Sequence, residues 1–103
     1  MMTPWGLSDS EERIIEGVTF YGTPSHGGFH LSPERERQLS VKLSEHGISV
    51  MDARMGYAAG WYEEDCCAYA VLFGFDEARP DSMTAEHCLE RLRYWINWKP
   101  RAS

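Results

Sequence analysis

The sequence has few basic residues and no long apolar run. Its 103 residues include 10 Lys and Arg against 16 Asp and Glu, which gives a formal net charge of −6. Because contact with nucleic-acid phosphates requires a cationic surface, this balance argues against direct binding of DNA or RNA. No apolar run approaches the roughly 18 residues that a transmembrane helix needs. We therefore expect neither nucleic acid nor a membrane as a partner.

Cysteine is scarce as well, and its spacing argues against two common uses. Cys66 and Cys67 are adjacent and Cys88 stands alone, which is neither a disulfide framework nor the Cys-x-x-Cys spacing of a zinc site. The N-terminus also lacks the basic and apolar segments of a signal peptide. Reduced, unligated thiols in a reducing compartment fit these features. We expect a cytoplasmic protein without a metal or a cofactor.

What the sequence does contain is enough for one compact domain over residues 1–103. A chain of this length buries roughly two thirds of its unfolded surface when it folds. Four Trp, five Tyr and four Phe are a rich aromatic supply for the core. We find no internal repeat, low-complexity tract or linker that would divide the chain.

The first third of the chain predicts a short antiparallel sheet. Two β-rich runs, residues 11–15 and 18–21, are separated by Glu16-Gly17, which predicts a tight hairpin. A turn at Ser25–Gly28 follows, and Phe29–Leu31 returns as a third strand. Consecutive antiparallel strands joined by short turns form a β-meander.

Three helices are expected beside this meander. Ser32-Pro33-Glu34 combines an N-cap, a proline in the first turn and an acidic residue, which is typical of a helix start. Asp81 or Ser82 is expected to cap a last helix with a clean apolar stripe. That stripe consists of Ala85, Cys88, Leu89, Leu92, Trp95 and Ile96.

The middle of the chain is harder to interpret. Residues 48–60 indicate an edge strand followed by a loop. In residues 61–75 an acidic run precedes a continuous apolar block, which favours a helix. Such a helix would place Asp65 on the packed face beside Trp61 and Tyr69. Taken together, the patterns predict an α+β fold, a small antiparallel β-meander packed against about three helices.

Two histidines are the candidate side chains for chemistry. If residues 26–30 are extended, His26 and His30 lie roughly 13 Å apart and cannot share a metal ion. Either histidine with Asp65 could perform general acid–base or hydrolytic chemistry. We favour a structural interpretation in which the Asp65 carboxylate accepts hydrogen bonds from the glycine turn or its serine. The residues of this structural motif are Ser25, Gly27, Gly28, Trp61, Glu64 and Asp65.

The two stretches SHGGFHLSPER and WYEEDC resemble an uncharacterised domain family of phage and plasmid proteins. The lead-in TPWG and the segment IIEGVTFYGTPSHGG are similar to it too, so the resemblance covers most of residues 3–40 and 61–75. It implies the genetic context of a mobile element and no particular chemistry. The positions that match are His26, Gly27, Gly28, Glu63, Glu64 and Asp65.

On these grounds we expect a small acidic protein-binding module that inhibits a host defence system, as an anti-CRISPR protein does. Its partner would be a host protein with a basic nucleic-acid-binding surface, because opposite charges attract. The acidic side chains expected at that interface are Glu11, Glu12, Glu86 and Glu90. The alternative function is that of a small enzyme that uses His26 or His30 with Asp65.

Overall fold

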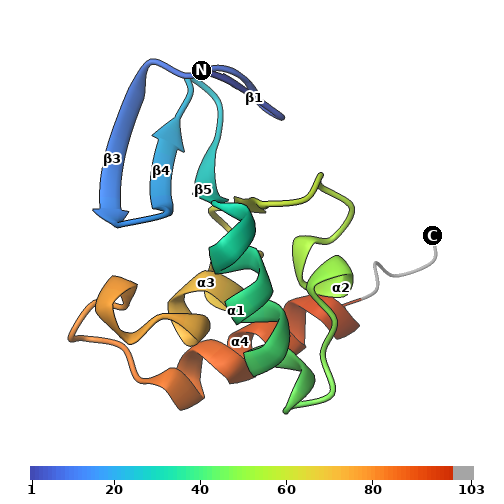
Figure 1. Ribbon diagram of the computed structural model, residues 1–103. Helices are drawn as coiled ribbons and strands as arrows, with labels where there is room; N and C mark the ends of the chain where they lie inside the picture. The colour runs from blue at the N-terminus through green and yellow to red at the C-terminus, as the bar shows by residue number, and fades with distance from the viewer. Residues whose placement is uncertain (99–103) are drawn as a thin grey trace, which may run out of the picture.

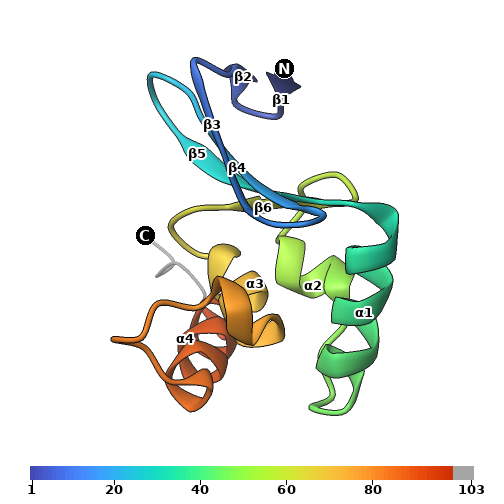
Figure 2. The same cartoon turned by 60° about the vertical axis from the view of Figure 1, so that its left-hand side comes forward.

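The computed structural model describes residues 1–98, and residues 99–103 of the expected domain lie outside the described part. Figures 1 and 2 show the strands on one side of the molecule and the helices on the other. The α+β prediction is therefore confirmed. In chain order the elements are β1 (Met2–Thr3), β2 (Gly6–Leu7), β3 (Ser10–Ile15), β4 (Val18–Gly22), β5 (Gly27–Leu31), α1 (Pro33–Ser44), α2 (Val50–Arg54), β6 (Trp61–Glu63), α3 (Ala68–Gly74), the 3-10 turn η1 (Asp76–Ala78) and α4 (Ala85–Asn97).

The main sheet has four antiparallel strands in the order β3-β4-β5-β6. Strands β3 to β5 form the predicted meander, and Gly17 of the β3–β4 turn has the expected positive φ of 82°. The fourth strand, β6, comes from much later in the chain. Its register pairs Gly28 with Glu63 and His30 with Trp61. Strand pairing therefore joins the two stretches that the sequence analysis singled out.

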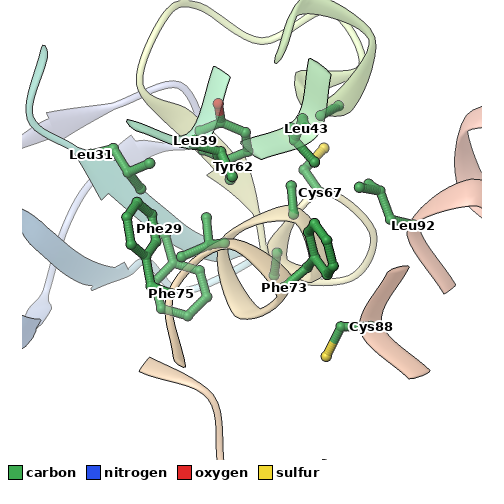
Figure 3. Packing of buried hydrophobic residues seen from close by; sticks show 14 of the residues in the cluster. Phe29, Leu31, Leu39, Leu43, Tyr62, Cys67, Phe73, Phe75, Cys88 and Leu92 are labelled. Carbon is green, nitrogen blue, oxygen red and sulfur yellow. The ribbon is translucent and has the colours of Figure 1, made fainter. Parts of the chain in front are cut away.

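The core lies between the inner face of this sheet and the helical layer. Side chains alternate across a strand, so Phe29 and Leu31 of β5 point inward while Gly28 and His30 point outward. Leu39 and Leu43, one turn apart on α1, are fully buried. Figure 3 shows the side chains of sheet and helices meeting in one cluster. Its labelled members are Phe29, Leu31, Leu39, Leu43, Tyr62, Cys67, Phe73, Phe75, Cys88 and Leu92.

The predicted edge strand in residues 48–60 is wrong, because this segment contains helix α2. Ser49 is its N-cap, and the Ser49 hydroxyl accepts a hydrogen bond from the Asp52 amide at 3.1 Å. A serine followed three residues later by an acid is a helix-start pattern that outweighs the apparent alternation of Ile48 and Val50.

The predicted helix over residues 61–75 is correct only in its second half. Residues 61–63 form β6, residues 64–67 form a turn, and α3 begins at Ala68. Tyr62 is fully buried while its two neighbours are only partly buried, which is the period of a strand. Pairing with the open edge of β5 outweighs the helical tendency of the acidic run. Asp65 is consequently exposed in the turn and does not lie on a packed helical face.

The last helix has the predicted stripe but a different start. Thr84 caps α4, and its hydroxyl accepts a hydrogen bond from the His87 amide at 3.0 Å. Neither Asp81 nor Ser82 has this role. Cys88 and Leu92 are fully buried, as the stripe requires. No helix within residues 1–98 is both long enough and apolar enough to cross a lipid bilayer.

Candidate functional site

The glycine turn is fastened to β6 by backbone hydrogen bonds. The Glu64 amide donates to the Gly27 carbonyl at 2.9 Å. The turn itself is closed by Thr23, whose amide and hydroxyl both donate to the His26 carbonyl at 2.7 Å. Ser25 is exposed in this turn. The backbone of Glu64 and the side chain of Thr23 thus do the work that we expected of Asp65 and Ser25.

Gly28 is a glycine because the indole of Trp5 lies against its backbone. A Cβ atom at this position would collide with the Trp5 ring on one side and with the Tyr62 carbonyl on the other. Trp5 also packs edge-on against Tyr57, at 5.4 Å between ring centroids, and against Trp61, at 5.8 Å. The N-terminal lead-in is therefore anchored by Trp5 on the outer face of the sheet.

Three side chains that can bind a metal ion or exchange a proton lie together beside this turn. One ligand atom each from His26, Glu63 and Asp65 lie within 4.8 Å of one another. The Asp65 amide donates to Glu63 Oε1 at 2.5 Å, which orients that carboxylate. His26 and Asp65 are exposed, and Glu63 is partly buried. One histidine–carboxylate pair of the alternative function, His26 with Asp65, is thus assembled.

The sheet register also gathers acidic residues from two distant segments at one end of the sheet. One row of paired residues runs Glu11, Tyr21, Gly28, Glu63 across all four strands. Three strand spacings make this row about 14 Å long. The Asp9 amide donates to the Gly22 carbonyl in the neighbouring row. We call Asp9, Glu11, Glu63, Glu64 and Asp65 the acidic end of the sheet.

The phenol of Tyr21 lies next to the acidic end, and its pKa responds to that neighbourhood. Burial, and after it the nearby Glu11 carboxylate, raise the pKa of Tyr21 above its ordinary value. Two ion pairs occur within residues 1–98, Arg54 with Glu36 and Arg79 with Asp76. Neither involves the acidic end. Its negative charge is therefore not neutralised by a Lys or Arg in the part of the chain that the structure describes.

Glu86 and Glu90, two of the predicted binding residues, lie elsewhere. They are exposed on α4, which Figures 1 and 2 show at the far side of the helices from β3. Arg91 on the same helix lies over the rings of Tyr69 and Tyr94, at 5.9 and 5.0 Å. The charge of this helix is thus mixed. Glu12 is exposed on β3, where it pairs with Phe20 and points to the opposite face of the sheet from Glu11.

His30, four residues after His26, has a different environment. Its ring packs against Trp61 at 4.5 Å between centroids with the planes tilted by 50°, and its centroid lies 6.4 Å from that of Tyr21. Burial lowers the pKa of His30 below its ordinary value, and the Glu36 carboxylate opposes this shift. The carboxylate near His30 is therefore Glu36, which the sequence analysis did not single out. His30 and Glu36 line a cavity of about 260 Å³ together with Leu31, Pro33, Ala59 and Gly60.

Glu36 is held in place by two partners. The Tyr62 hydroxyl donates to Glu36 Oε1 at 2.8 Å, and Arg54 Nε lies 3.5 Å from the same oxygen. Burial and the Glu36 hydrogen bond raise the pKa of Tyr62 far above its ordinary range. Because α1, α2 and β6 supply these residues, no sequence spacing could have revealed the group.

The adjacent cysteines are free thiols in contact with each other. Cys66 Sγ and Cys67 Sγ are 3.6 Å apart, and the Cys67 thiol donates to the Arg54 carbonyl at 3.3 Å. The Cys67 thiol lowers the pKa of Cys66, while this interaction and burial raise the pKa of Cys67. Cys88 is buried separately under α4. Cys66 is thus the most accessible of the three thiols.

Comparison with known sequences places the chain in a family. Residues 1–102 match the family model described as "Domain of unknown function (DUF7007)". The chain belongs to this family. Comparison with curated proteins and with solved structures found no match. The family assignment extends over both stretches that meet at the glycine turn and brings no activity with it.

Proposed function

We propose that this chain is a small acidic protein-binding module of a mobile genetic element that inhibits a host defence system, in the manner of anti-CRISPR proteins. It would occupy a basic nucleic-acid-binding surface of a host protein. The observation that carries this proposal is the acidic end of the sheet. The proposed genetic context comes from the resemblance of SHGGFHLSPER and WYEEDC to phage and plasmid proteins.

The acidic end suits such a partner for two reasons. Glu11 lies in β3 and Glu63 in β6, and the sheet places these two at the ends of a row of about 14 Å. Asp9, Glu64 and Asp65 lie in the segments next to these strands. Carboxylates spaced by the sheet can imitate the phosphates that a basic surface normally binds. Because these charges have no Lys or Arg partner within residues 1–98, they remain available to steer association with a cationic surface.

The structure changes which residues we expect at the interface. Glu11 stays in the proposed contact surface, and Glu64 joins it from the other edge of the sheet. Glu86 and Glu90 become the natural control, since they are also exposed acids but lie on α4 among arginines.

The test is capture of the partner and competition with its nucleic acid. Tagged protein is incubated with host lysate, and bound proteins are identified by mass spectrometry. We expect a basic nucleic-acid-binding protein. Its capture should weaken as the salt concentration rises, because screening by salt reduces the range of electrostatic attraction. The purified partner should then lose its nucleic acid when this protein is added. A partner that binds both at once would contradict the proposal.

A matched pair of double variants connects this result to the acidic end. Glu11→Lys with Glu64→Lys should abolish capture, whereas Glu86→Lys with Glu90→Lys should leave it unchanged. Both doubles alter the formal charge by the same amount, so they separate position from net charge. Equal effects of the two doubles would show that only the overall acidity matters.

A second candidate function is acid–base or hydrolytic chemistry at His26 with Asp65. The observation that favours it is their approach, together with Glu63, to within 4.8 Å. A histidine that acts as a general base needs a group such as a carboxylate to orient its ring. It also needs to be accessible to the substrate. Turnover of ester or phosphoester substrates that is lost in His26→Ala would support this candidate. A His26→Ala protein with unchanged turnover would exclude it.

A further inference from the structure

We propose that His26, Glu63 and Asp65 form a binding site for one divalent transition-metal ion of the Mn²⁺ or Zn²⁺ class. From the sequence we expect no metal, because His30 is the only nearby partner that sequence spacing offers His26. Pairing of β5 with β6 supplies the missing ligands from a segment 37 positions away. This inference does not depend on the proposed function.

The geometry needs only a small adjustment to close around an ion. Ligand bonds of about 2.1 Å place the ligand atoms of one coordination sphere about 3 Å apart. Here the three ligand atoms already lie within 4.8 Å of one another. His26 and Asp65 are exposed in turns, so rotation of their side chains can shorten these distances. Glu63 is the fixed member, because it sits in β6 opposite Gly28.

The charge around the cluster favours a cation. Two carboxylates belong to the cluster itself, and Glu64 adds a third from the same turn. Glu64 Oε2 lies 3.1 Å from where a Cβ of Gly27 would be, next to His26. The two ion pairs within residues 1–98 involve other carboxylates. A divalent cation would neutralise charge that no basic side chain neutralises in this part of the chain.

The donor types indicate the class of metal. The imidazole nitrogen suits Zn²⁺, an ion of intermediate softness, and the two carboxylate oxygens also suit the harder ion Mn²⁺. Ca²⁺ prefers six to eight oxygen ligands, so a site with three protein ligands and one nitrogen suits it poorly. Three protein ligands leave further positions of the coordination sphere to water.

The experiment measures binding of Mn²⁺ to the isolated protein. Mn²⁺ is the better probe because the thiols of Cys66 and Cys67 follow Asp65 and would compete for Zn²⁺. Free Mn²⁺ is quantified by electron paramagnetic resonance during a titration of untagged protein. We expect saturation at one equivalent. Paramagnetic broadening in a ¹H–¹⁵N spectrum should begin at the amides of His26, Gly27 and Asp65.

Variants then separate ligation from simple attraction to an acidic surface. His26→Ala and Asp65→Asn should each raise the dissociation constant by about tenfold or more. Glu64→Gln removes the same charge as Asp65→Asn from the same turn but no ligand, so it should change the constant by less than about twofold. His87→Ala, an exposed histidine on α4, should have no effect. A thermal melt of every variant checks that it is folded.

Two results would overturn the proposal. One is the lack of saturable one-equivalent binding of Mn²⁺ by the parent protein. The other is an effect of Glu64→Gln as large as that of Asp65→Asn, which would reveal diffuse attraction without a defined site. If Asp65→Asn proves unfolded, the comparison of His26→Ala with His87→Ala decides in its place.

Discussion

A histidine lies at each end of strand β5, His30 near its close and His26 just before its start, and the two have opposite environments. His30 packs against Trp61, and Oε1 of the nearby Glu36 is paired with Tyr62 and Arg54. His26 is exposed at the glycine turn, beside Glu63 and Asp65. At the first end Glu36 Oε1 is paired within the fold, while Glu36 Oε2 is buried without a hydrogen-bond partner among the described residues. The second end presents unneutralised carboxylates at the surface.

This difference indicates which end is available for binding. A buried carboxylate is costly unless it is paired, and Tyr62 and Arg54 meet that requirement for one of the two oxygens of Glu36. Exposed carboxylates have no such requirement, because water solvates them. Two of those at the acidic end, Glu11 and Glu63, are nevertheless held in register by the paired strands. We infer that the His30 end stabilises the fold and that the His26 end binds.

The largest effect on stability is expected at Gly28, which lies between the two ends. Gly28→Ala adds a Cβ that collides with the Trp5 ring and the Tyr62 carbonyl. Because one of these neighbours is backbone, we expect a loss of about 3 kcal/mol in the free energy of unfolding. Chemical denaturation measures it.

Gly47→Ala is the matched control for Gly28. Gly47 has a φ of 74° and open space around it, so an added Cβ there costs only backbone strain of about 1 kcal/mol. Equal losses at the two glycines would show that the packing of Trp5 on the sheet is unimportant.

At the His30 end, Tyr62→Phe should lower the free energy of unfolding by about 2 kcal/mol. The substitution removes the hydroxyl that donates to Glu36 at 2.8 Å and leaves a largely buried carboxylate with one partner fewer. Tyr94→Phe, at an exposed tyrosine of α4, should change stability by less than about 0.5 kcal/mol. If both variants denature alike, the carboxylate is not stabilised by the phenol.

A smaller effect should appear as a dependence of stability on pH. Burial lowers the pKa of His30, so below about pH 6.5 the unfolded chain takes up a proton that the folded chain still excludes. This contribution to stability is complete above pH 6.5 and is lost as the pH falls toward the folded pKa. Melting of His30→Gln should therefore depend less on pH than that of the parent. An NMR titration that gives His30 a pKa of 6.5 or higher would contradict this.

The sequence was informative where local signals decide structure. The Glu16-Gly17 hairpin, the Ser32 cap of α1 and the apolar stripe of α4 depend on neighbours within a few residues. All three are confirmed. The short helix α2 also had a local signal, since Ser49 and Asp52 have the spacing of a helix start.

The candidate site was less predictable because it depends on pairing between distant segments. Glu63 and Asp65 were assigned to a helix, since an acidic run before an apolar block favours one when no partner strand is known. The open edge of β5 makes Trp61–Glu63 a strand. Only this pairing brings the carboxylates to His26 and Glu11. The single sequence had named these residues but could not reveal that they meet.

The most direct test of the binding role of the acidic end is a defence assay with the two charge-reversal doubles. Cells with an active CRISPR–Cas system express the parent, Glu11→Lys with Glu64→Lys, or Glu86→Lys with Glu90→Lys, and are challenged with a targeted phage. We expect the parent and the α4 double to restore plaque formation, and the double at the acidic end to fail while still folded. Full inhibition by that double would contradict the account.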